Sequence, residues 1–302
     1  MENYLDQELN GRKLLKRAPT PFENEYTPEL DVSPELDTKT ATFYQTQVGV
    51  LRWIVELGRI DLITEASLLA SQMALPREGH LDALIRTFSY LKWKHNSRMI
   101  FDPTYPEINY DEFPKHDWTN FYGDVKEAIP PNAPRTAGKD IDLRMFVDSD
   151  HAGDKATRRS RTGYFIFMNT APIMWYSKKQ STIETSVFGA EMVAMKTGIE
   201  ALRGLRYKLR MMGVQISGPT YIYGDNMSVV NNASKPESTL KKKLNSICYH
   251  AIRESVAMNE SRVTHIPTTN NCADLATKVI PGGMKRNALI SRIIYDVADV
   301  HA

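Results

Sequence analysis

Four acidic residues in the second half of the chain stand at positions suited to metal-dependent chemistry. Asp148 ends an alternating apolar run, and Asp225 follows a second strand-like run. Glu191 lies on a long amphipathic stretch, and Asp274 stands at an expected helix start. Several carboxylates brought together would repel one another unless divalent cations lay between them. The set therefore predicts a two-metal phosphodiester hydrolase.

Each of these carboxylates has an expected role, because hard cations prefer oxygen ligands. Asp148 would bridge the two ions, although Asp150 competes for this role because residues two apart share one face of a strand. Glu191 and Asp225 would each complete the coordination of one ion. Asp274 would be the fourth ligand, but an aspartate in a first helical turn also stabilises the helix dipole.

Apolar periodicity from residue 141 onward alternates between strand and helix. Strands are expected at 143–148, 163–168, 172–177, 220–224 and 261–266. Helices are expected at about 182–211, after Asn226, at about 239–258 and from 272. Three successive strands, then strands interleaved with helices, predict a mixed sheet covered by helices. Asn169-Thr170-Ala171 is expected to form a hairpin turn.

The remaining segments differ in composition, and proline-rich stretches suggest where the chain divides. We expect a boundary near residue 139 and three helices in the second segment. The predicted parts are an acidic, Pro-rich linker without a fold of its own (1–40), a helical segment (41–102), a second linker (103–140), an α/β domain (141–281) and a helical tail (282–302).

Composition excludes several classes of protein. The hydrophobic fraction of 42% and the charged fraction of 25% are typical of a globular chain with a real core. No apolar run approaches the ~20 residues that span a bilayer, and the N-terminus lacks a secretory signal pattern. Two cysteines suggest reduced thiols. We expect an intracellular protein, cytoplasmic or nuclear, with no membrane partner.

Charge is distributed unevenly beneath the net value of +2. Residues 142–285 hold 20 Lys and Arg against 12 Asp and Glu, whereas the rest of the chain holds 18 against 24. A positive surplus around carboxylates favours a phosphate-rich polymer, although it could simply be a solvated surface. The expected nucleic-acid contacts are the cations Lys155, Arg158, Arg159, Arg161, Lys178 and Lys179 and the polar groups Ser160, Thr162, Gln180 and Asn226.

Six short motifs carry a family resemblance in their order and spacing. They are Phe146–Asp154, Arg159–Tyr164, Trp175–Gln180, Asp225-Asn226, Tyr249–Glu254 and Ala273–Lys278. This set resembles the RNase H domain of copia-type LTR retrotransposon polyproteins. Upstream, Tyr44–Leu51 and Arg86–Lys92 resemble the thumb-like or connection-like segment between polymerase and RNase H in those polyproteins.

The resemblance implies an α/β, RNase H-like fold, with a mixed five-stranded sheet flanked by helices and preceded by a small helical segment. It implies hydrolysis of the RNA strand of RNA–DNA hybrids with two Mg²⁺ or Mn²⁺ ions. The polymerase part of the same polyprotein would be a further partner. No Tyr-x-Asp-Asp motif occurs, so the chain resembles a C-terminal fragment that lacks the polymerase palm.

Two departures from the family pattern leave alternatives open. Gly189-Ala190-Glu191 keeps only the second of two glutamates usual in the family, and Thr268 and Thr269 occupy the region of a flexible histidine. One alternative is a catalytically inactive remnant that binds nucleic acid. Another is an integrase or transposase, but those enzymes place the glutamate last, whereas here it comes second.

Overall fold

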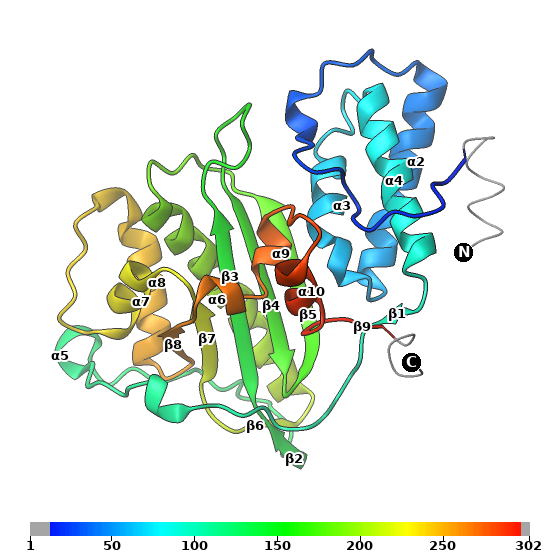
Figure 1. Ribbon diagram of the computed structural model, residues 1–302. Helices are drawn as coiled ribbons and strands as arrows, with labels where there is room; N and C mark the ends of the chain where they lie inside the picture. Colours follow the sequence, from blue (N-terminus) through cyan, green and yellow to red (C-terminus); the bar gives the residue numbers. More distant parts are fainter. Residues whose placement is uncertain (1–12, 297–302) are drawn as a thin grey trace. The chain divides into compact units, whose positions relative to one another are not determined.

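The alternating run that contains Asp148 forms β3 (Leu143–Asp150), the central strand of a five-stranded sheet (Figure 1). The structure is a computed structural model that describes residues 13–296. The strand order is β5-β4-β3-β7-β8, with β4 antiparallel to β3 and β5, and β7 parallel to β3 and β8. The predicted mixed five-stranded sheet is therefore confirmed. The other strands are β4 (Arg161–Met168), β5 (Ala171–Lys179), β7 (Thr220–Gly224) and β8 (Ser261–His265).

The predicted hairpin turn joins β4 to β5. Asn169 has φ 55°, in the left-handed region that asparagine tolerates better than most residues. Its side-chain oxygen also accepts a hydrogen bond from the backbone N–H of Asp142 at 2.9 Å. Asparagine thus supplies the backbone conformation that a glycine more often gives in such turns.

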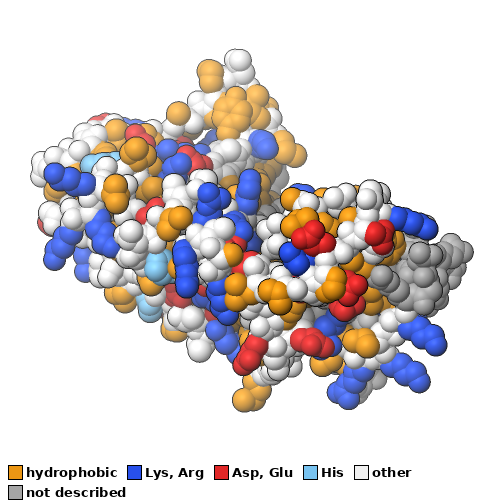
Figure 2. Space-filling view, turned by 90° about the horizontal axis from the view of Figure 1, so that it is seen from above, with side chains coloured by type: hydrophobic (Ala, Val, Ile, Leu, Met, Phe, Trp, Pro, Cys, Tyr) orange, Lys and Arg blue, Asp and Glu red, His pale blue; other side chains and the backbone are white. Residues whose placement is uncertain are grey.

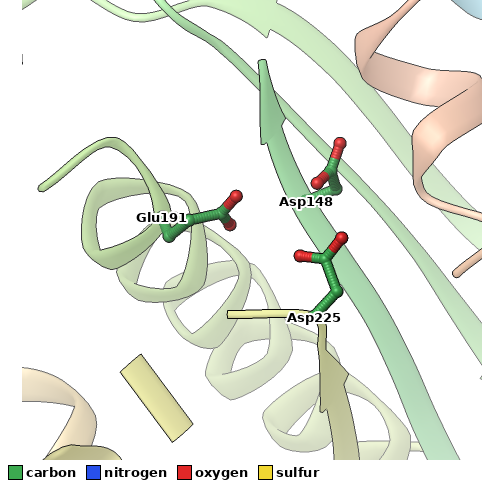
Figure 3. A group of neighbouring side chains, drawn as sticks. All are labelled: Asp148, Glu191 and Asp225. Carbon is green, nitrogen blue, oxygen red and sulfur yellow. The ribbon is translucent and has the colours of Figure 1, made fainter. Parts of the chain in front are cut away.

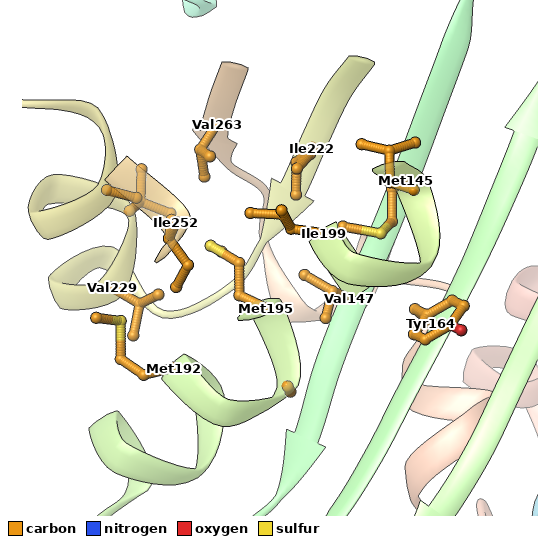
Figure 4. Close-up of a cluster of buried hydrophobic side chains, with 14 of the residues drawn as sticks. Met145, Val147, Tyr164, Met192, Met195, Ile199, Ile222, Val229, Ile252 and Val263 are labelled. Carbon is orange, nitrogen blue, oxygen red and sulfur yellow. The ribbon is translucent and has the colours of Figure 1, made fainter. Parts of the chain in front are cut away.

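One face of β3 forms the main core. Leu143, Met145 and Val147 alternate along the strand and pack against α6 (Val187–Met211), α7 (Met227–Ser234) and α8 (Ser246–Ala257) (Figure 4). Gly198 allows α6 to approach closely, because a Cβ there would lie 2.8 Å from the Met145 sulfur. The other face of the sheet is covered partly by the short helix α9 (Asp274–Thr277).

Two of the long helices begin later than predicted. The α6 helix begins at Val187 rather than near 182, because the Ser186 hydroxyl accepts a hydrogen bond from the N–H of Gly189 and caps it. The α8 helix begins at Ser246 rather than near 239, after the 3₁₀ turn η4 (Lys243–Asn245). The preceding lysines are exposed, so they bring no apolar face whose burial would stabilise an earlier start.

The chain divides into two compact units, and the larger one comprises residues 101–153 and 158–277. The predicted linker 103–140 belongs to this larger unit. Phe113 is buried, with its ring centroid 4.9 Å from Tyr221 and 5.3 Å from Tyr223. This compact unit includes the Pro-rich segment from Phe101 onward, because buried aromatic side chains attach that segment to the sheet. Its elements are η3 (Tyr110–Glu112), α5 (Thr119–Tyr122) and β2 (Ala137–Ile141), the last paired in parallel with β6 (Val214–Ile216).

The smaller unit contains described residues 13–100, 154–157 and 278–296. The three helices predicted here are present, with the short 3₁₀ turns η1 and η2 beside them. Their bounds are η1 (Pro28–Leu30), α2 (Thr38–Glu56), η2 (Ile60–Leu62), α3 (Ile63–Ala70) and α4 (Glu78–Trp93). Among residues 13–296, no helix combines the length and apolar character needed to cross a membrane.

Both terminal segments are more ordered than the sequence suggests, as far as they are described. The predicted linker 1–40 packs on α4 from residue 13 onward: Phe22 is buried, and the Thr87 hydroxyl lies 3.4 Å from the Pro21 carbonyl oxygen. The predicted tail 282–302 contains α10 (Met284–Ile290) and then β9 (Tyr295–Asp296), which pairs with β1 (Ser97–Arg98). Residues 1–12 and 297–302 of these predicted segments lie outside the described residues.

A buried ion pair holds the C-terminal segment in the smaller unit. Arg286 on α10 lies 3.6 Å from Glu65 on α3, and both side chains are almost fully buried. A charge removed from water in this way needs its partner, so the pair links the two helices. The division of the chain into functional segments stays a prediction.

Glu127 in the segment 103–140 should contribute measurably to the stability of the larger unit. It accepts hydrogen bonds from Arg206 at 2.7 and 2.8 Å and from Arg210 at 2.7 Å. Burial alone would raise the pKa of Glu127, but the two guanidinium groups outweigh it and hold the pKa below its usual value. We expect Glu127→Gln to lower the free energy of unfolding by about 2–4 kcal/mol, measured by chemical denaturation at pH 7.

The exposed Glu107 in the same segment is the matched control, and Glu107→Gln should change stability by less than about 0.5 kcal/mol. Because the pKa of Glu127 is depressed, its contribution is present above the ordinary carboxyl pKa and is lost as pH falls through the folded-state value. The difference between wild type and Glu127→Gln should therefore shrink in acid. A constant difference down to pH 2 would contradict this assignment.

Candidate metal centre

Strand register brings two of the predicted carboxylates together. In the parallel pair β3 and β7, Phe146 lies opposite Tyr223. The same register continued for two residues sets Asp225, just after β7, beside Asp148 on β3. Neighbouring strands are about 4.8 Å apart, and both residues share the face of Phe146 and Tyr223. The geometry of a parallel pair thus places two aspartates side by side at its carboxyl end.

The third carboxylate comes from the first part of α6. Glu191 lies on the buried stripe of this helix, one turn before Met195. Met195 belongs to the core, and its Cε would lie 3.3 Å from a Cβ added at Gly224, the last residue of β7. The packing that fixes Met195 against the sheet therefore also sets Glu191 near the strand ends.

Oxygens of Asp148, Glu191 and Asp225 all lie within 4.8 Å of one another (Figure 3). The three side chains point toward one another from β3, α6 and the end of β7. Asp148 is 1% exposed and Glu191 is 7% exposed, so water screens their charges poorly. Hard carboxylate oxygens at this spacing fit a divalent cation, which would also relieve their mutual repulsion. The cluster can bind metal.

The other two candidates lie outside this cluster. Strand β3 continues through Asp150, so Asp150 lies on the same face of the strand as Asp148, as its alternative role as the bridging ligand requires. Asp274 is fully buried at the start of α9. Among the described residues, neither belongs to the group of three. The role of Asp274 as a fourth ligand stays a prediction.

Sequence reasoning assigned no role in the site to three polar side chains that contact it. The Thr277 hydroxyl donates to Asp148 Oδ2, and the Thr268 hydroxyl donates to Asp225 Oδ2 at 2.9 Å. Asn271 Nδ2 donates to the carbonyl oxygen of Val147 at 3.0 Å. Thr277 lies within the motif Ala273–Lys278, three residues after Asp274, and Thr268 lies in the region where the resembling family has a flexible histidine.

Five of the expected nucleic-acid contacts lie near the protein surface in the larger unit. Arg158, Arg159 and Lys178 are exposed, and Lys179 and Asn226 are half-buried. Figure 2 looks onto the carboxyl end of β3, and Lys and Arg side chains are spread over the larger unit on this face. Lys155 is exposed but belongs to the smaller unit, where its N–H donates to Glu29 at 3.0 Å.

Four of the expected contacts are buried in the larger unit: Ser160, Arg161, Thr162 and Gln180. Gln180 Nε2 donates to the Thr162 hydroxyl and to the Ala190 carbonyl, each at 3.0 Å, and so connects β4 to the residue before Glu191. Burial argues against direct contact with a nucleic acid, because these side chains lack exposed surface. Asn226 caps α7 by accepting hydrogen bonds from two backbone N–H groups.

Sequence relatives of this chain include retrotransposon Pol polyproteins. The chain is 26% identical over 252 residues to a retrovirus-related Pol polyprotein from transposon RE1 of Arabidopsis thaliana, covering 83% of this chain and 15% of that protein. It is 33% identical over 145 residues to the Pol polyprotein from transposon TNT 1-94 of Nicotiana tabacum, covering 48% of this chain and 11% of that protein. No protein-family model matches.

This chain is a distant homologue of copia-type Pol polyproteins. It spans about a seventh of the length of the curated relatives that it matches over most of its own length. Among solved structures, it is similar to an RNase H1 isolated from compost, with 17% identity and a TM-score of 0.37, over 45% of this chain and 92% of that one. The strand order and directions of its own sheet are those of the RNase H-like fold.

Divalent metal should stabilise the protein through the three carboxylates. We expect Mg²⁺ at a hundred times its dissociation constant to raise the free energy of unfolding by about 2.7 kcal/mol. Glu191→Gln should remove this increment and should stabilise the metal-free protein, because one repelling charge is gone. Thermal unfolding with EDTA and with Mg²⁺ measures both effects.

Glu200→Gln is the matched control, since Glu200 is an exposed glutamate on the same helix and pairs with Lys196. It should keep the full response to Mg²⁺. A wild-type protein with equal stability in EDTA and in Mg²⁺ would show that the cluster does not act as a metal site.

Proposed function

We propose that this chain is a ribonuclease H that hydrolyses the RNA strand of RNA–DNA hybrids by a two-metal mechanism. The observation that carries the proposal is the group Asp148, Glu191 and Asp225, gathered at the carboxyl end of the central parallel strands. The homology to Pol polyproteins and the RNase H-like strand order support it. The chain would act as part of a reverse transcriptase–RNase H polyprotein, inside the cell, with the polymerase part as a further partner.

In this proposal the three carboxylates hold two Mg²⁺ or Mn²⁺ ions, with Asp274 as a predicted fourth ligand. Bound ions of this kind lower the pKa of water and neutralise charge on a phosphate. The protein supplies oxygen ligands in fixed positions, and two of these carboxylates are buried away from water. Because Asp148 and Glu191 are buried, their oxygens stay in place while the edge near the half-buried Asp225 remains accessible to a substrate.

Basic side chains near this edge would hold the hybrid by its phosphates. Lys178 on β5 is in register with Thr162 on β4, which pairs with Ser149 on β3, next to Asp148. Two strand spacings, or about 10 Å, therefore separate Lys178 from Ser149. Arg158 and Arg159 are exposed in the loop that follows β3. In this proposal, these exposed cations contact phosphates of the bound hybrid.

The alternative is a catalytically inactive remnant that still binds nucleic acid. It is favoured by Gly189, which stands where the resembling family has the first of two glutamates. The cation contacts would survive in such a remnant, but cleavage would not. The two proposals differ in a single measurement, which is cleavage of a hybrid that is demonstrably bound.

We expect wild-type protein with Mg²⁺ or Mn²⁺ to cleave the RNA strand of a labelled hybrid and to leave a DNA duplex of the same sequence intact. Asp148→Asn and Glu191→Gln should reduce the rate at least about a thousandfold, equivalent to about 4 kcal/mol, while hybrid affinity stays within about twofold. Glu200→Gln should cleave normally. Tight hybrid binding without cleavage by the wild type would favour the inactive remnant.

Binding of the hybrid should depend on salt through individual surface cations. Lys178→Ala and Arg159→Ala should each weaken binding and reduce the slope of log affinity against log salt by about 1. Lys208 is exposed on α6, 17 residues or about 26 Å beyond Glu191, and serves as the control. Lys208→Ala should leave the slope unchanged. Equal slopes in all four proteins would remove Lys178 and Arg159 from the binding surface.

A further inference from the structure

One short segment of the larger unit contacts both aspartates of the cluster. From this segment, residues 268–277, the Thr277 hydroxyl donates to Asp148 and the Thr268 hydroxyl donates to Asp225. Asn271 contributes the hydrogen bond to the Val147 carbonyl, one residue before Asp148. Two of the three cluster carboxylates therefore accept a hydrogen bond from a hydroxyl group of the same segment.

Gly163 provides the space for the first of these contacts. It lies directly opposite Asp148 in the β3–β4 pair. A Cβ at Gly163 would lie 2.6 Å from the Thr277 methyl carbon, 2.7 Å from the Ala276 Cβ and 2.8 Å from the Ala276 carbonyl carbon. Glycine inside a strand often marks the close approach of another backbone, and here that backbone is α9. The missing side chain lets Thr277 reach the carboxylate on the neighbouring strand.

The Thr277 hydroxyl has one proton and three acceptors within reach. Besides the Asp148 oxygen, the carbonyl oxygens of Ala273 at 3.4 Å and Asp274 at 3.3 Å are acceptors at the long end of the hydrogen-bond range. Thr277 is 2% exposed, so water competes little for this charge-assisted bond. Thr268 is exposed, and its bond to Asp225 competes with solvent. The two contacts should therefore differ in strength.

We propose that Thr277 is a positioning residue that fixes the Asp148 carboxylate for metal binding, with Gly163 as the structural condition for its approach and Thr268 as a weaker equivalent on Asp225. The inference rests on the proposed function, because it concerns the same carboxylates. The hydrogen bond from the Thr277 hydroxyl restricts the rotation of the Asp148 carboxylate. It thereby orients the carboxylate toward a bound cation, as hydrogen bonds to ligating carboxylates generally do.

The test is the affinity of the whole chain for Mn²⁺ alone, measured by calorimetry and by the loss of the free Mn²⁺ signal in electron paramagnetic resonance. Thr277→Val keeps the shape and removes the hydroxyl, and it should weaken Mn²⁺ binding by about 10- to 100-fold. Thr277→Ser retains the donor and should restore affinity to within about threefold of wild type. Thr268→Val should weaken binding less than Thr277→Val.

Two further variants separate positioning from a general loss of structure. Thr197→Val removes a hydroxyl that donates to a carbonyl four residues earlier on α6, and Mn²⁺ affinity should not change. Gly163→Ala should weaken Mn²⁺ binding as Thr277→Val does, because the new methyl group displaces α9. Gly204→Ala is its control, since a Cβ there meets nothing within 4 Å and affinity should be unchanged.

The outcomes separate the two proposals. A wild-type chain that binds no Mn²⁺ would overturn the proposed function, and this inference with it. Equal Mn²⁺ affinity in wild type and a folded Thr277→Val protein would overturn the inference alone. If Thr277→Val does not fold, Gly163→Ala decides, and unchanged affinity in that variant overturns the inference.

Discussion

Mutual repulsion among three carboxylates is the constraint on which the larger unit depends. With oxygens within 4.8 Å of one another and an effective dielectric constant of about 20, each charged pair is unfavourable by at least about 3.5 kcal/mol. Asp148 and Glu191 cannot move toward water to relieve this, because both are buried. The surrounding backbone must therefore hold them in place. The five-stranded sheet and α6 do so through strand register and tight apolar packing.

Glycines and small polar groups around the cluster make this arrangement possible. Gly198 lets α6 lie close to Met145, which fixes the depth of the helix that carries Glu191. Gly163 lets α9 approach the strand opposite Asp148. Gln180 joins β4 to the backbone beside Glu191. Each feature shortens a distance between two elements, and a rigid centre for a cation follows from their combination.

Charges elsewhere in the protein are arranged in a different way. Glu127 in the larger unit and Glu65 in the smaller unit are paired with arginines, so burial does not leave them uncompensated. The cluster carboxylates instead gather like charges. Like charges in a buried group are costly to fold and are commonly associated with ion binding or catalysis. This contrast distinguishes the candidate metal centre from the ion pairs that stabilise each unit.

The sequence by itself determined the type of sheet and three members of the cluster. Alternation in β3, the capped start of α7 after Asp225 and the apolar stripe around Glu191 are local patterns, and local patterns are visible in a single sequence. The resemblance of six spaced motifs added the RNase H-like fold with a mixed five-stranded sheet, and the strand order came from the structure. The late start of α8 was missed because the run 239–245 has apolar and basic residues of helical type, yet residues 241–244 are exposed and gain no burial from an earlier helix start.

Only the tertiary structure decided which polar residues face solvent and which support the site. Gln180, Ser160 and Arg161 have the composition of surface contacts, yet all three are buried, since burial depends on what packs over a residue and not on its type. The hydroxyl contacts of Thr268 and Thr277 join residues 43 and 129 positions apart in the chain. Such pairs come into contact only when strand register and the approach of α9 to Gly163 are fixed, and neither is written in the local sequence.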